Sequence, residues 1–417
     1  MKFVRQPFLL FISVMALFAS GSKAGVYDPS TLSTVLPGKW RGVFHLRPGV
    51  EVPFNFEIRP SGKALEVYLV NGDEKFATGN LNISGDSAFI PLSLFDNELA
   101  FAVDGNRLTG VLRRVDKRGS GTLFEAAKGG NFRFIETGTL PVKDISGRYD
   151  VVFQQAGGKE EKAVGIFRQE GNRLQATFLR VTGDSRYLDG MIEGRDIALS
   201  SFIGSGPVYY KATVQEDGSI KGEIVTARGG QPFVAALNDK ASLPDAYTLT
   251  RLKKETSSLQ FSFPDAKGDL VSTADQRFAG KVLVVTIGGT WCPNCMDEAA
   301  FLAPWYEKNR SRGVEVVALQ YERDTSRGNV KKVFDRFSRR YNLKYPLLLG
   351  GVADKKAVTA SLPALDNFLS FPTTLFIDRK GQVRKIHTGF SGPATGAEYG
   401  KFIHEFNDTV NELLAEK

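Results

Sequence analysis

The stretch KVLVVTIGGTWCPNC, residues 281–295, decides the fold of the C-terminal third of this 417-residue chain. Its first seven residues are almost continuously apolar, which is typical of a strand buried on both faces of a parallel sheet. A Gly-Gly-Thr turn follows, and Trp291 then leads into Cys-Pro-Asn-Cys. Proline suits the first turn of a helix, where its missing N–H costs no hydrogen bond. We therefore predict a buried strand, a tight turn and a helix from Cys292 to about Arg310.

Cys292 and Cys295 are the only cysteines in the sequence. Unpaired N–H groups and the helix dipole at a helix start favour the thiolate form of Cys292. Cys295 follows three residues later on the same face of the helix, so the two sulfur atoms come within disulfide reach. Cys292 can therefore attack a disulfide, and Cys295 can resolve the mixed disulfide that forms. The spacing predicts a dithiol site, shielded by Trp291.

Strands and helices alternate through the rest of this region. The patterns predict strands at 314–319, 345–349, 372–378 and 383–387, and helices at 330–341 and 397–415. Such alternation is typical of an α/β domain. We place this domain at residues 256–417 and interpret the polar residues 253–258 as a linker.

Three separated motifs in this domain occur in a specific order. They are residues 290–298 with Trp-Cys-x-x-Cys, residues 371–378 beginning Phe-Pro-Thr-Thr, and the glycine-rich residues 389–396. Together they resemble the thioredoxin fold and, more narrowly, the bacterial TlpA-like redoxins, over about residues 260–414. The resemblance implies an enzyme, an exported protein thiol–disulfide oxidoreductase that uses no cofactor. It also implies two kinds of partner, protein disulfide substrates and an extracytoplasmic electron donor.

The resemblance also implies roles for individual residues. Cys292 would be the nucleophile and Cys295 the resolving thiol. Pro372 matches the cis-proline that faces the disulfide in this family, an isomer that is uncommon before proline in general. It would turn the backbone of Phe371 toward Cys292, where a substrate strand can pair. Trp291 and Phe371 are thus expected in the substrate-binding surface.

Glu298 matches an acidic residue that these proteins often carry three places after the second cysteine. It returns to nearly the same helix face as Cys295. Burial and a neighbouring thiolate would raise its pKa and suit it to move the proton of Cys295. The alternative is that Glu298 and Asp297 only complement the positive end of the helix.

Two residues depart from the family pattern. Thr286 stands where thioredoxins carry a buried aspartate, and Asn294 stands where TlpA-like proteins usually carry proline. Asn294 supplies an extra backbone N–H near the sulfur atoms, which could stabilise a thiolate. The redox potential therefore does not follow from the resemblance.

Other chemistries fit the cysteine pair less well. A zinc site needs about four ligands, whereas the chain has two cysteines, and His387 and His404 have no paired spacing. A peroxidase of the peroxiredoxin type calls for Thr-x-x-Cys, and Gly289 stands at that threonine position. We predict no metal and no bound cofactor.

The residues before the α/β domain predict antiparallel strands. Apolar and polar residues alternate with period two, for example at 54–58, and Asn-Gly or Asp-Gly turns separate such runs. The region also resembles itself, since Gly38-Lys39-Trp40 aligns with Gly147-Arg148-Tyr149. We predict two repeated β-rich units, each a barrel or a sandwich, at residues 25–140 and 141–255. Neither unit shows a catalytic constellation.

The first 24 residues predict a signal peptide. Lys2 and Arg5 precede an apolar run at 7–19, and small residues lead to Ser-Lys-Ala at 22–24. The run is shorter than the roughly 20 residues that span a bilayer. We expect cleavage after residue 24 and a periplasmic or otherwise extracytoplasmic protein, where disulfide chemistry is permitted. An uncleaved anchor is the alternative.

The formal charge of +8 is mild and spread along the chain, unlike the concentrated basic surface of a nucleic-acid binder. Four basic residues share one predicted helix face, which we expect to be a solvated surface: Lys332, Arg336, Arg339 and Arg340. Docking of this face to an anionic membrane or partner is the alternative.

The β-rich region leaves a second class of function open. The chain could be an envelope binding or scaffold protein whose β units bind a ligand or partner, with the dithiol domain auxiliary. Dithiol chemistry is the favoured hypothesis because its residues occur at the spacing that the reaction needs.

Overall fold

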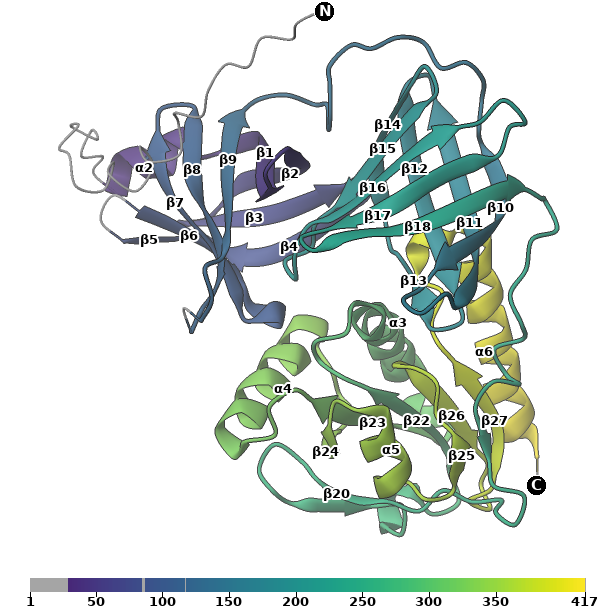
Figure 1. Ribbon diagram of the computed structural model, residues 1–417. Helices are drawn as coiled ribbons and strands as arrows, with labels where there is room; N and C mark the ends of the chain where they lie inside the picture. The colour runs from purple at the N-terminus through teal and green to yellow at the C-terminus, as the bar shows by residue number, and fades with distance from the viewer. Residues whose placement is uncertain (1–28, 85–86, 117, 417) are drawn as a thin grey trace, which may run out of the picture.

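The computed structural model describes residues 29–84, 87–116 and 118–416, which form two β-rich units above one α/β domain (Figure 1). The predicted signal peptide, residues 1–24, lies outside the described residues. Within those residues, no helix combines the length and the apolar character needed to span a membrane.

The first unit is a nine-stranded antiparallel sheet that follows a short helix, α2 (Pro29–Val35). The order across the sheet is β4-β3-β2-β1-β9-β8-β7-β6-β5, so that β4 and β5 are its edges. Its strands are β1 (Gly38–Arg47), β2 (Val50–Ser61), β3 (Ala64–Asn71), β4 (Glu74–Asn80), β5 (Asn82–Ser84), β6 (Ser87–Leu92), β7 (Asn97–Asp104), β8 (Arg107–Arg114) and β9 (Thr122–Lys128).

The second unit repeats this meander but closes on itself. Strand β12 pairs with both β11 and β14, which completes a barrel-like ring. Its strands are β10 (Gly147–Gln154), β11 (Glu160–Glu170), β12 (Arg173–Arg180), β13 (Gly183–Asp184), β14 (Leu188–Glu193), β15 (Asp196–Ser201), β16 (Val208–Val214), β17 (Ile220–Thr226) and β18 (Gly229–Leu237).

The two units match strand for strand, which confirms the predicted pair of repeated β-rich units. The aligned aromatic residues also make the same contact. Trp40 Nε1 donates a hydrogen bond to the carbonyl of Leu36, and the hydroxyl of Tyr149 donates to the carbonyl of Ile145, four residues back in each case. Both rings are buried at the start of their sheets. The domain boundaries at 140 and 255 stay predictions.

Phe202, which follows β15, joins the two units. Its side chain enters the core of the first unit, with ring centroids 4.8 Å from Phe44 and 5.4 Å from Phe54. The side chain of Asn71 pairs with both backbone groups of Phe202, at 3.0 and 3.1 Å. The two units therefore share part of one core.

We expect Phe202→Ala to lower the free energy of unfolding by about 3–5 kcal/mol, because the lost ring leaves a cavity in the first unit. Chemical denaturation followed by tryptophan fluorescence measures this, since Trp40 lies in the same core. Leu123→Ala removes an exposed side chain and should change stability by less than about 0.5 kcal/mol. Equal effects of the two substitutions would contradict a shared core.

The C-terminal domain has a five-stranded mixed sheet in the order β24-β23-β22-β26-β27, with helices on both faces (Figure 1). This confirms the predicted α/β thioredoxin fold after the β-rich region. The strands are β22 (Val282–Gly288), β23 (Val314–Glu322), β24 (Leu347–Val352), β26 (Thr373–Ile377) and β27 (Val383–Thr388). The helices are α3 (Pro293–Asn309), α4 (Arg327–Tyr341), α5 (Lys355–Ser361) and α6 (Ala397–Ala415).

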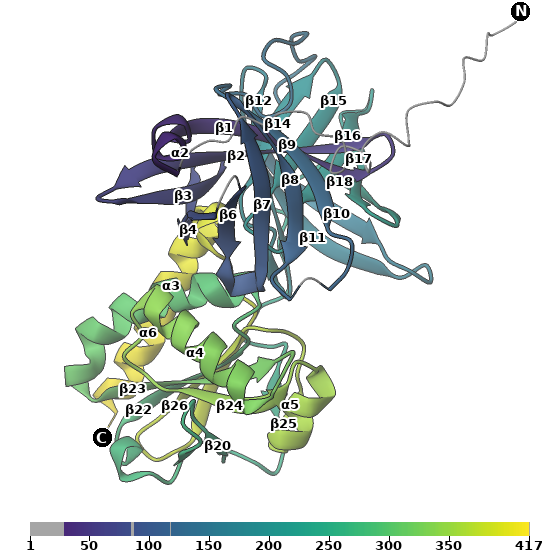
Figure 2. The same cartoon turned by 90° about the vertical axis from the view of Figure 1, so that its left-hand side faces the viewer.

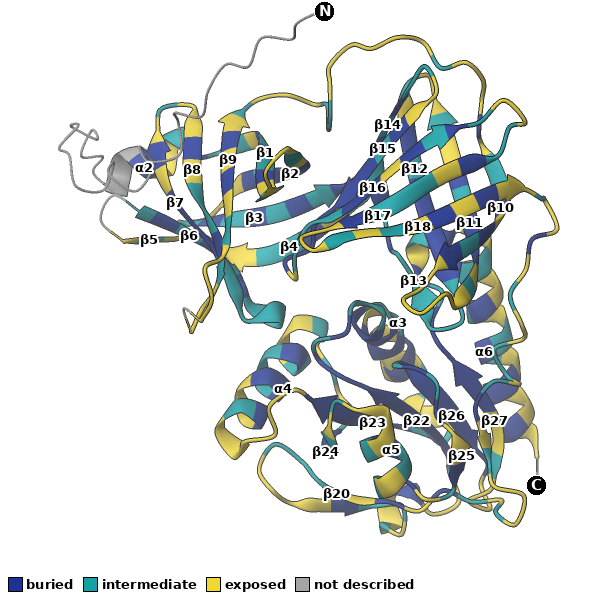
Figure 3. Cartoon of the chain, in the orientation of Figure 1, coloured by how far each residue is buried: buried dark blue, intermediate teal, exposed yellow. Residues whose placement is uncertain are grey.

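Strand β22 is buried along its whole length, as its continuous apolar sequence predicts (Figure 3). Val282 and Val284 pack in the cluster that contains α3, α4 and α6, whereas Leu283 and Val285 pack in the cluster of the opposite face. The opposite face carries α5 and the hairpin of β20 (Ser262–Pro264) and β21 (Leu270–Ser272). Strand β24 starts later than predicted, after Pro346, because proline has no N–H for the ladder.

The residues that we interpreted as a linker are bound to the C-terminal domain. The two-residue strand β19 (Arg251–Leu252) pairs with β25 (Leu365–Asn367). Lys253 N donates to the Ala364 carbonyl at 2.9 Å, and Val383 N donates to the Ser257 carbonyl at 2.7 Å. The polar composition of 253–258 therefore reflects an exposed edge of the domain.

The basic face of α4 is only partly solvated, because Lys332, Arg339 and Arg340 are exposed and Arg336 is half-buried. Both β units lie on the same side of the C-terminal domain (Figure 2), and Asp96 of the first unit pairs with Lys332 at 2.8 Å and with Arg336 at 3.2 Å. The guanidinium of Arg340 lies 5.1 Å from the ring centre of Phe76. Lys332, Arg336 and Arg340 thus also contact the chain's own first β unit, which helix periodicity alone does not predict.

Candidate active site

Cys292 is the N-cap of α3, and Pro293 is the first residue of the helix. The backbone N–H of Cys295 donates to Cys292 Sγ at 3.4 Å, so the two residues adjoin at the helix start. Both cysteines are free thiols with 5% of their surface exposed. A Cβ on Gly288 would lie 3.2 Å from Cys295 Sγ, which explains the small residue at the end of β22.

The cis-proline loop faces the cysteines. The Phe371–Pro372 peptide bond is cis, the isomer that the resemblance implies. Cys292 Sγ lies 3.7 Å from the Phe371 carbonyl oxygen. Trp291 makes an edge contact with the Phe371 ring at 5.7 Å and donates its Nε1–H to the Tyr321 carbonyl. The fold thus brings together residues that are about 80 positions apart in the chain.

Glu298 lies in the interior, with 4% of its surface exposed. Burial raises its pKa to about 7, and a hydrogen bond from the Thr374 hydroxyl, 2.5 Å long, partly opposes this. Burial also raises the pKa of Cys295 well above its usual value, and the negative charge of Glu298 adds to that effect. A charged Glu298 therefore disfavours the thiolate form of Cys295.

The helix-dipole interpretation of Asp297 and Glu298 does not fit their positions. The first turn of α3 contains no acidic residue, and dipole effects fade beyond the first turn. Asp297 forms an ion pair with Arg186 of the second β unit. Burial raises the pKa of Asp297 to about 7, and Arg186 opposes the shift.

Sequence reasoning missed a second buried carboxyl beside the cysteine turn. Glu322, at the end of β23, accepts hydrogen bonds from the backbone N–H of Thr290 at 2.9 Å and from its hydroxyl at 3.0 Å. Burial raises its pKa to about 7. The available signal is an acidic residue at the carboxyl end of an apolar strand, where sites gather in open α/β sheets. Thr286, at the family's aspartate position, is buried in β22.

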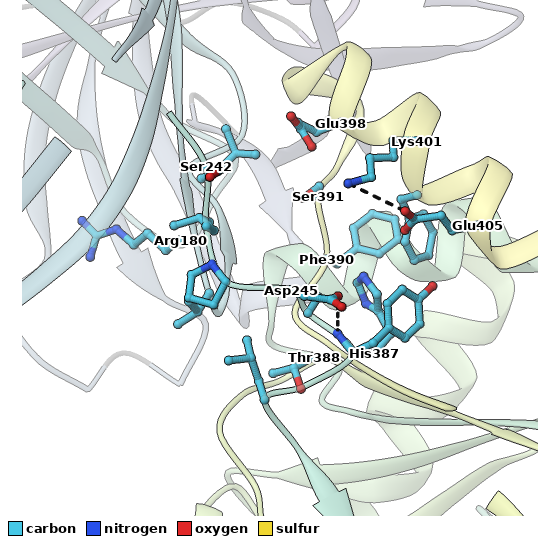
Figure 4. A pocket seen from close by; sticks show the side chains of 18 of the residues that line it. Arg180, Ser242, Asp245, His387, Thr388, Phe390, Ser391, Glu398, Lys401 and Glu405 are labelled. Carbon is cyan, nitrogen blue, oxygen red and sulfur yellow. Dashed lines mark hydrogen bonds and ion pairs between the residues drawn. The ribbon is translucent and has the colours of Figure 1, made fainter. Parts of the chain in front are cut away.

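A cavity of 510 Å³ lies between the second β unit, the segment 242–249 and helix α6 (Figure 4). Its charged residues are mostly paired, as in Arg148–Glu398 at 2.9 Å. His387 lies at the floor of the cavity. Since a carbonyl oxygen can only accept a hydrogen bond, His387 donates its Nδ1–H to the carbonyl of Gly389. Burial lowers the pKa of His387 to about 4. Among the described residues, no group of three or more His, Cys, Asp or Glu side chains could hold a metal.

Comparisons with known proteins agree on the C-terminal domain. The Redoxin family matches residues 253–401. Thioredoxin-like protein YneN of Bacillus subtilis is 32% identical over 129 residues, which are 31% of this chain and 68% of that protein. The chain belongs to the TlpA-like redoxin family. Thiol-disulfide oxidoreductase ResA of the same species is 29% identical over 129 residues, 31% of this chain and 64% of ResA.

The redoxin domain is thus that of a thiol–disulfide oxidoreductase, and the chain spans about two thirds of the length of these curated relatives. A solved structure, a thiol:disulfide interchange protein of the thioredoxin family from Chlorobium tepidum, is 22% identical. It covers 40% of this chain and 98% of its own, with a TM-score of 0.28. None of these matches extends over the two β units as a whole.

Proposed function

We propose that this redoxin is exported and that it reduces or exchanges protein disulfides through Cys292 and Cys295. The observation that carries the proposal is the position of Cys292, which caps the start of α3 and lies 3.7 Å from the Phe371 carbonyl. A helix start stabilises negative charge on the sulfur. The adjacent backbone at Phe371 offers an edge along which a substrate chain can lie.

In the proposed reaction the Cys292 thiolate attacks one sulfur of a substrate disulfide, and the other substrate sulfur leaves as a thiolate. Cys295 then loses its proton and attacks Cys292 Sγ, which releases the second substrate sulfur and leaves an intramolecular disulfide. The substrate gains two electrons and the enzyme loses two. A dithiol electron donor outside the cytoplasm restores the reduced pair by the same exchange in reverse.

Glu298 is the proposed acceptor of the proton that Cys295 loses. Its burial, its pKa of about 7 and its electrostatic effect on Cys295 support this role. Pro372 and Phe371 are proposed to position the substrate backbone, and Trp291 to shield the sulfur atoms. The signal-like sequence of residues 1–24 supports export, with residues 25–140, 141–255 and 256–417 as the proposed units of the mature protein.

Reduction of insulin disulfides by the full mature chain in the presence of dithiothreitol tests the activity. We expect the wild-type chain to accelerate precipitation of the insulin B chain, and the Cys292→Ser chain to match the uncatalysed reaction. An equal rate for wild type and Cys292→Ser would contradict the proposal. Amino-terminal sequencing of the protein from the extracytoplasmic fraction should begin at Gly25.

The cavity of Figure 4 favours a second candidate function, in which the β region binds a ligand or partner and the dithiol domain is auxiliary. A chain with Cys292→Ser and Cys295→Ala separates the two. A ligand that raises its melting temperature and fails to do so after Arg180→Glu, which reverses a charge at the cavity wall, would support the binding function.

A further inference from the structure

A segment of the second β unit lies against the start of the redox helix. Residues 181–187 connect β12 to β14, and Figure 1 shows β13 above α3. The side-chain amide of Asn294, between the two cysteines, donates to the Asp184 carbonyl at 3.3 Å. Gly183 lies so close that a Cβ there would be 2.7 Å from the Asn294 side chain. The residue that departs from the family's proline is therefore a contact for this segment.

The same segment also contacts the other side of the dithiol site. The hydroxyl of Ser370, next to the cis-proline dipeptide, donates to the Thr182 carbonyl at 3.0 Å. The backbone N–H of Gly392 donates to the Asp184 carboxylate at 2.5 Å. Residues 182–184 thus bridge the helix that carries the cysteines and the loops that face them.

Arg186 anchors the segment. Its guanidinium pairs with Asp297 of α3 and with Glu74 of the first β unit, and it donates to the Pro293 carbonyl at 3.2 Å. Only 9% of the Arg186 side chain is exposed. Removal of one partner from a buried ion pair leaves an uncompensated charge. Loss of Arg186 should therefore strongly weaken the contact between residues 182–186 and helix α3.

The repeat of the two β units departs from itself at this point. Strand β4 of the first unit has seven residues, whereas β13, its counterpart, has two. The second unit therefore has a much shorter strand at the place where it contacts the redox site. The two residues of β13 and their neighbour Thr182 are those that contact α3 and the cis-proline loop.

A protein disulfide needs access to Cys292 Sγ and to the backbone beside Pro372. Cys292 is 5% exposed, and this segment contacts Asn294 and Ser370, which lie next to those two places. We propose that residues 182–186 form an autoinhibitory cap, which occupies the place of a substrate chain and must move before a protein disulfide reaches Cys292. The inhibitory role of the cap rests on the proposed function, because a cap inhibits only if Cys292 reacts with protein disulfides. The accessibility of Cys292 can be measured without catalysis.

The test uses the full mature chain with Cys295→Ala, so that Cys292 is the single thiol. Its modification is timed with iodoacetamide and with a bulky maleimide-polyethylene glycol. Arg186→Ala removes the anchor, and Gly183→Val forces a side chain against Asn294. In both we expect the bulky reagent to react at least about tenfold faster than in the parent chain.

Two matched variants serve as controls. Gly229→Val places the same side chain at a glycine of the same unit with a similar backbone angle, φ +154° against +136° at Gly183, but with nothing within 4 Å of its Cβ. Arg113→Ala breaks a partly buried ion pair with Glu98 inside the first unit. Both should leave the rate of modification unchanged, and circular dichroism establishes that each variant is folded.

Unchanged rates in folded Arg186→Ala and Gly183→Val chains would overturn the cap. Equal acceleration in the controls would also overturn it, because general loosening would then explain the effect. If Arg186→Ala does not fold, Gly183→Val decides. Insulin reduction in the chain with both cysteines is scored separately. Faster modification of Cys292 in the two variants, without insulin reduction by the chain with both cysteines, would contradict the proposed function and support the cap. Insulin reduction with unchanged modification rates would contradict the cap alone.

Discussion

Cys295→Ala is expected to accumulate a stable mixed disulfide with a protein substrate, whereas Cys292→Ser forms none and loses all exchange. The reason is positional. Cys292 caps α3 and faces the Phe371 carbonyl, while Cys295 lies inside the helix with a pKa that burial raises well above its usual value. Cys292 can therefore start the exchange, and Cys295 is needed to finish it. Non-reducing electrophoresis and mass spectrometry of the adduct with a scrambled protein measure both outcomes.

The order of thiol modification provides the control for this prediction. In the reduced wild-type chain, limited alkylation near neutral pH should modify Cys292 before Cys295. Preferential modification of Cys295, or a mixed disulfide on Cys295 in the Cys292→Ser chain, would contradict the assignment. The same Cys295→Ala chain can retain the natural substrate from an extracytoplasmic extract, and the partner would then be identified by its peptide masses.

Glu298→Gln is expected to slow the resolution step by about 10²-fold, because the amide cannot accept the proton of Cys295. In the wild-type chain the carboxylate is the active form. Since its pKa is about 7, the rate of resolution should rise as the pH increases through about 7. The variant should lose this rise. Stopped-flow reduction of a model disulfide between pH 5 and pH 9 measures the two profiles, and identical profiles would exclude the proton-transfer role.

Glu298→Gln slows the reaction but is expected to stabilise the fold above about pH 4.5. The folded pKa of Glu298 is raised from 4.5 to about 7, so the folded state binds its proton more tightly than the unfolded state does. The wild-type free energy of unfolding should therefore fall by up to about 3 kcal/mol as the pH rises from about 4.5 to 7, and stay lowered above that. The Glu298→Gln chain has no carboxyl at this position and does not lose this free energy. Its free energy of unfolding relative to wild type should therefore increase between pH 4.5 and pH 7.

Urea unfolding at pH 4.5 and pH 8 of both chains gives this difference directly. Asp297 and Glu322 also have pKa values raised to about 7, but they are present in both chains and cancel in the comparison. A constant stability difference across pH would contradict the buried, protonated state of Glu298. Slower resolution together with a pH-dependent gain in stability is the combination that a helix-dipole role does not produce.

Local sequence predicted the elements that carry the chemistry. The apolar run before the cysteines predicted β22, and the proline after Cys292 predicted the start of α3, because strand burial and helix capping depend on residues close in sequence. The alternation of apolar residues and the internal similarity predicted two β-rich units. Pro372 came from resemblance, because its relation to the cysteines exists only in the folded domain. The spacing placed Glu298 on the helix face of Cys295, but its proposed role came from resemblance.

The tertiary structure decided what lies against these elements. Periodicity placed Arg336 on a helix face, but only packing brought Asp96 of the first unit to it. The place of Glu322 at the end of a strand marks it as a candidate, but only packing shows that it binds the Thr290 backbone 32 positions away.

The same division holds for the cap. The sequence by itself determined a dithiol at a helix start, and it marked Asn294 as a departure from the family. It did not determine that Gly183 and Arg186, more than 100 positions earlier, contact the two residues between the cysteines. Strand and helix patterns arise from backbone hydrogen bonds over a few residues, whereas the placement of one unit on another depends on shape and charge contributed by distant segments, which no local pattern records.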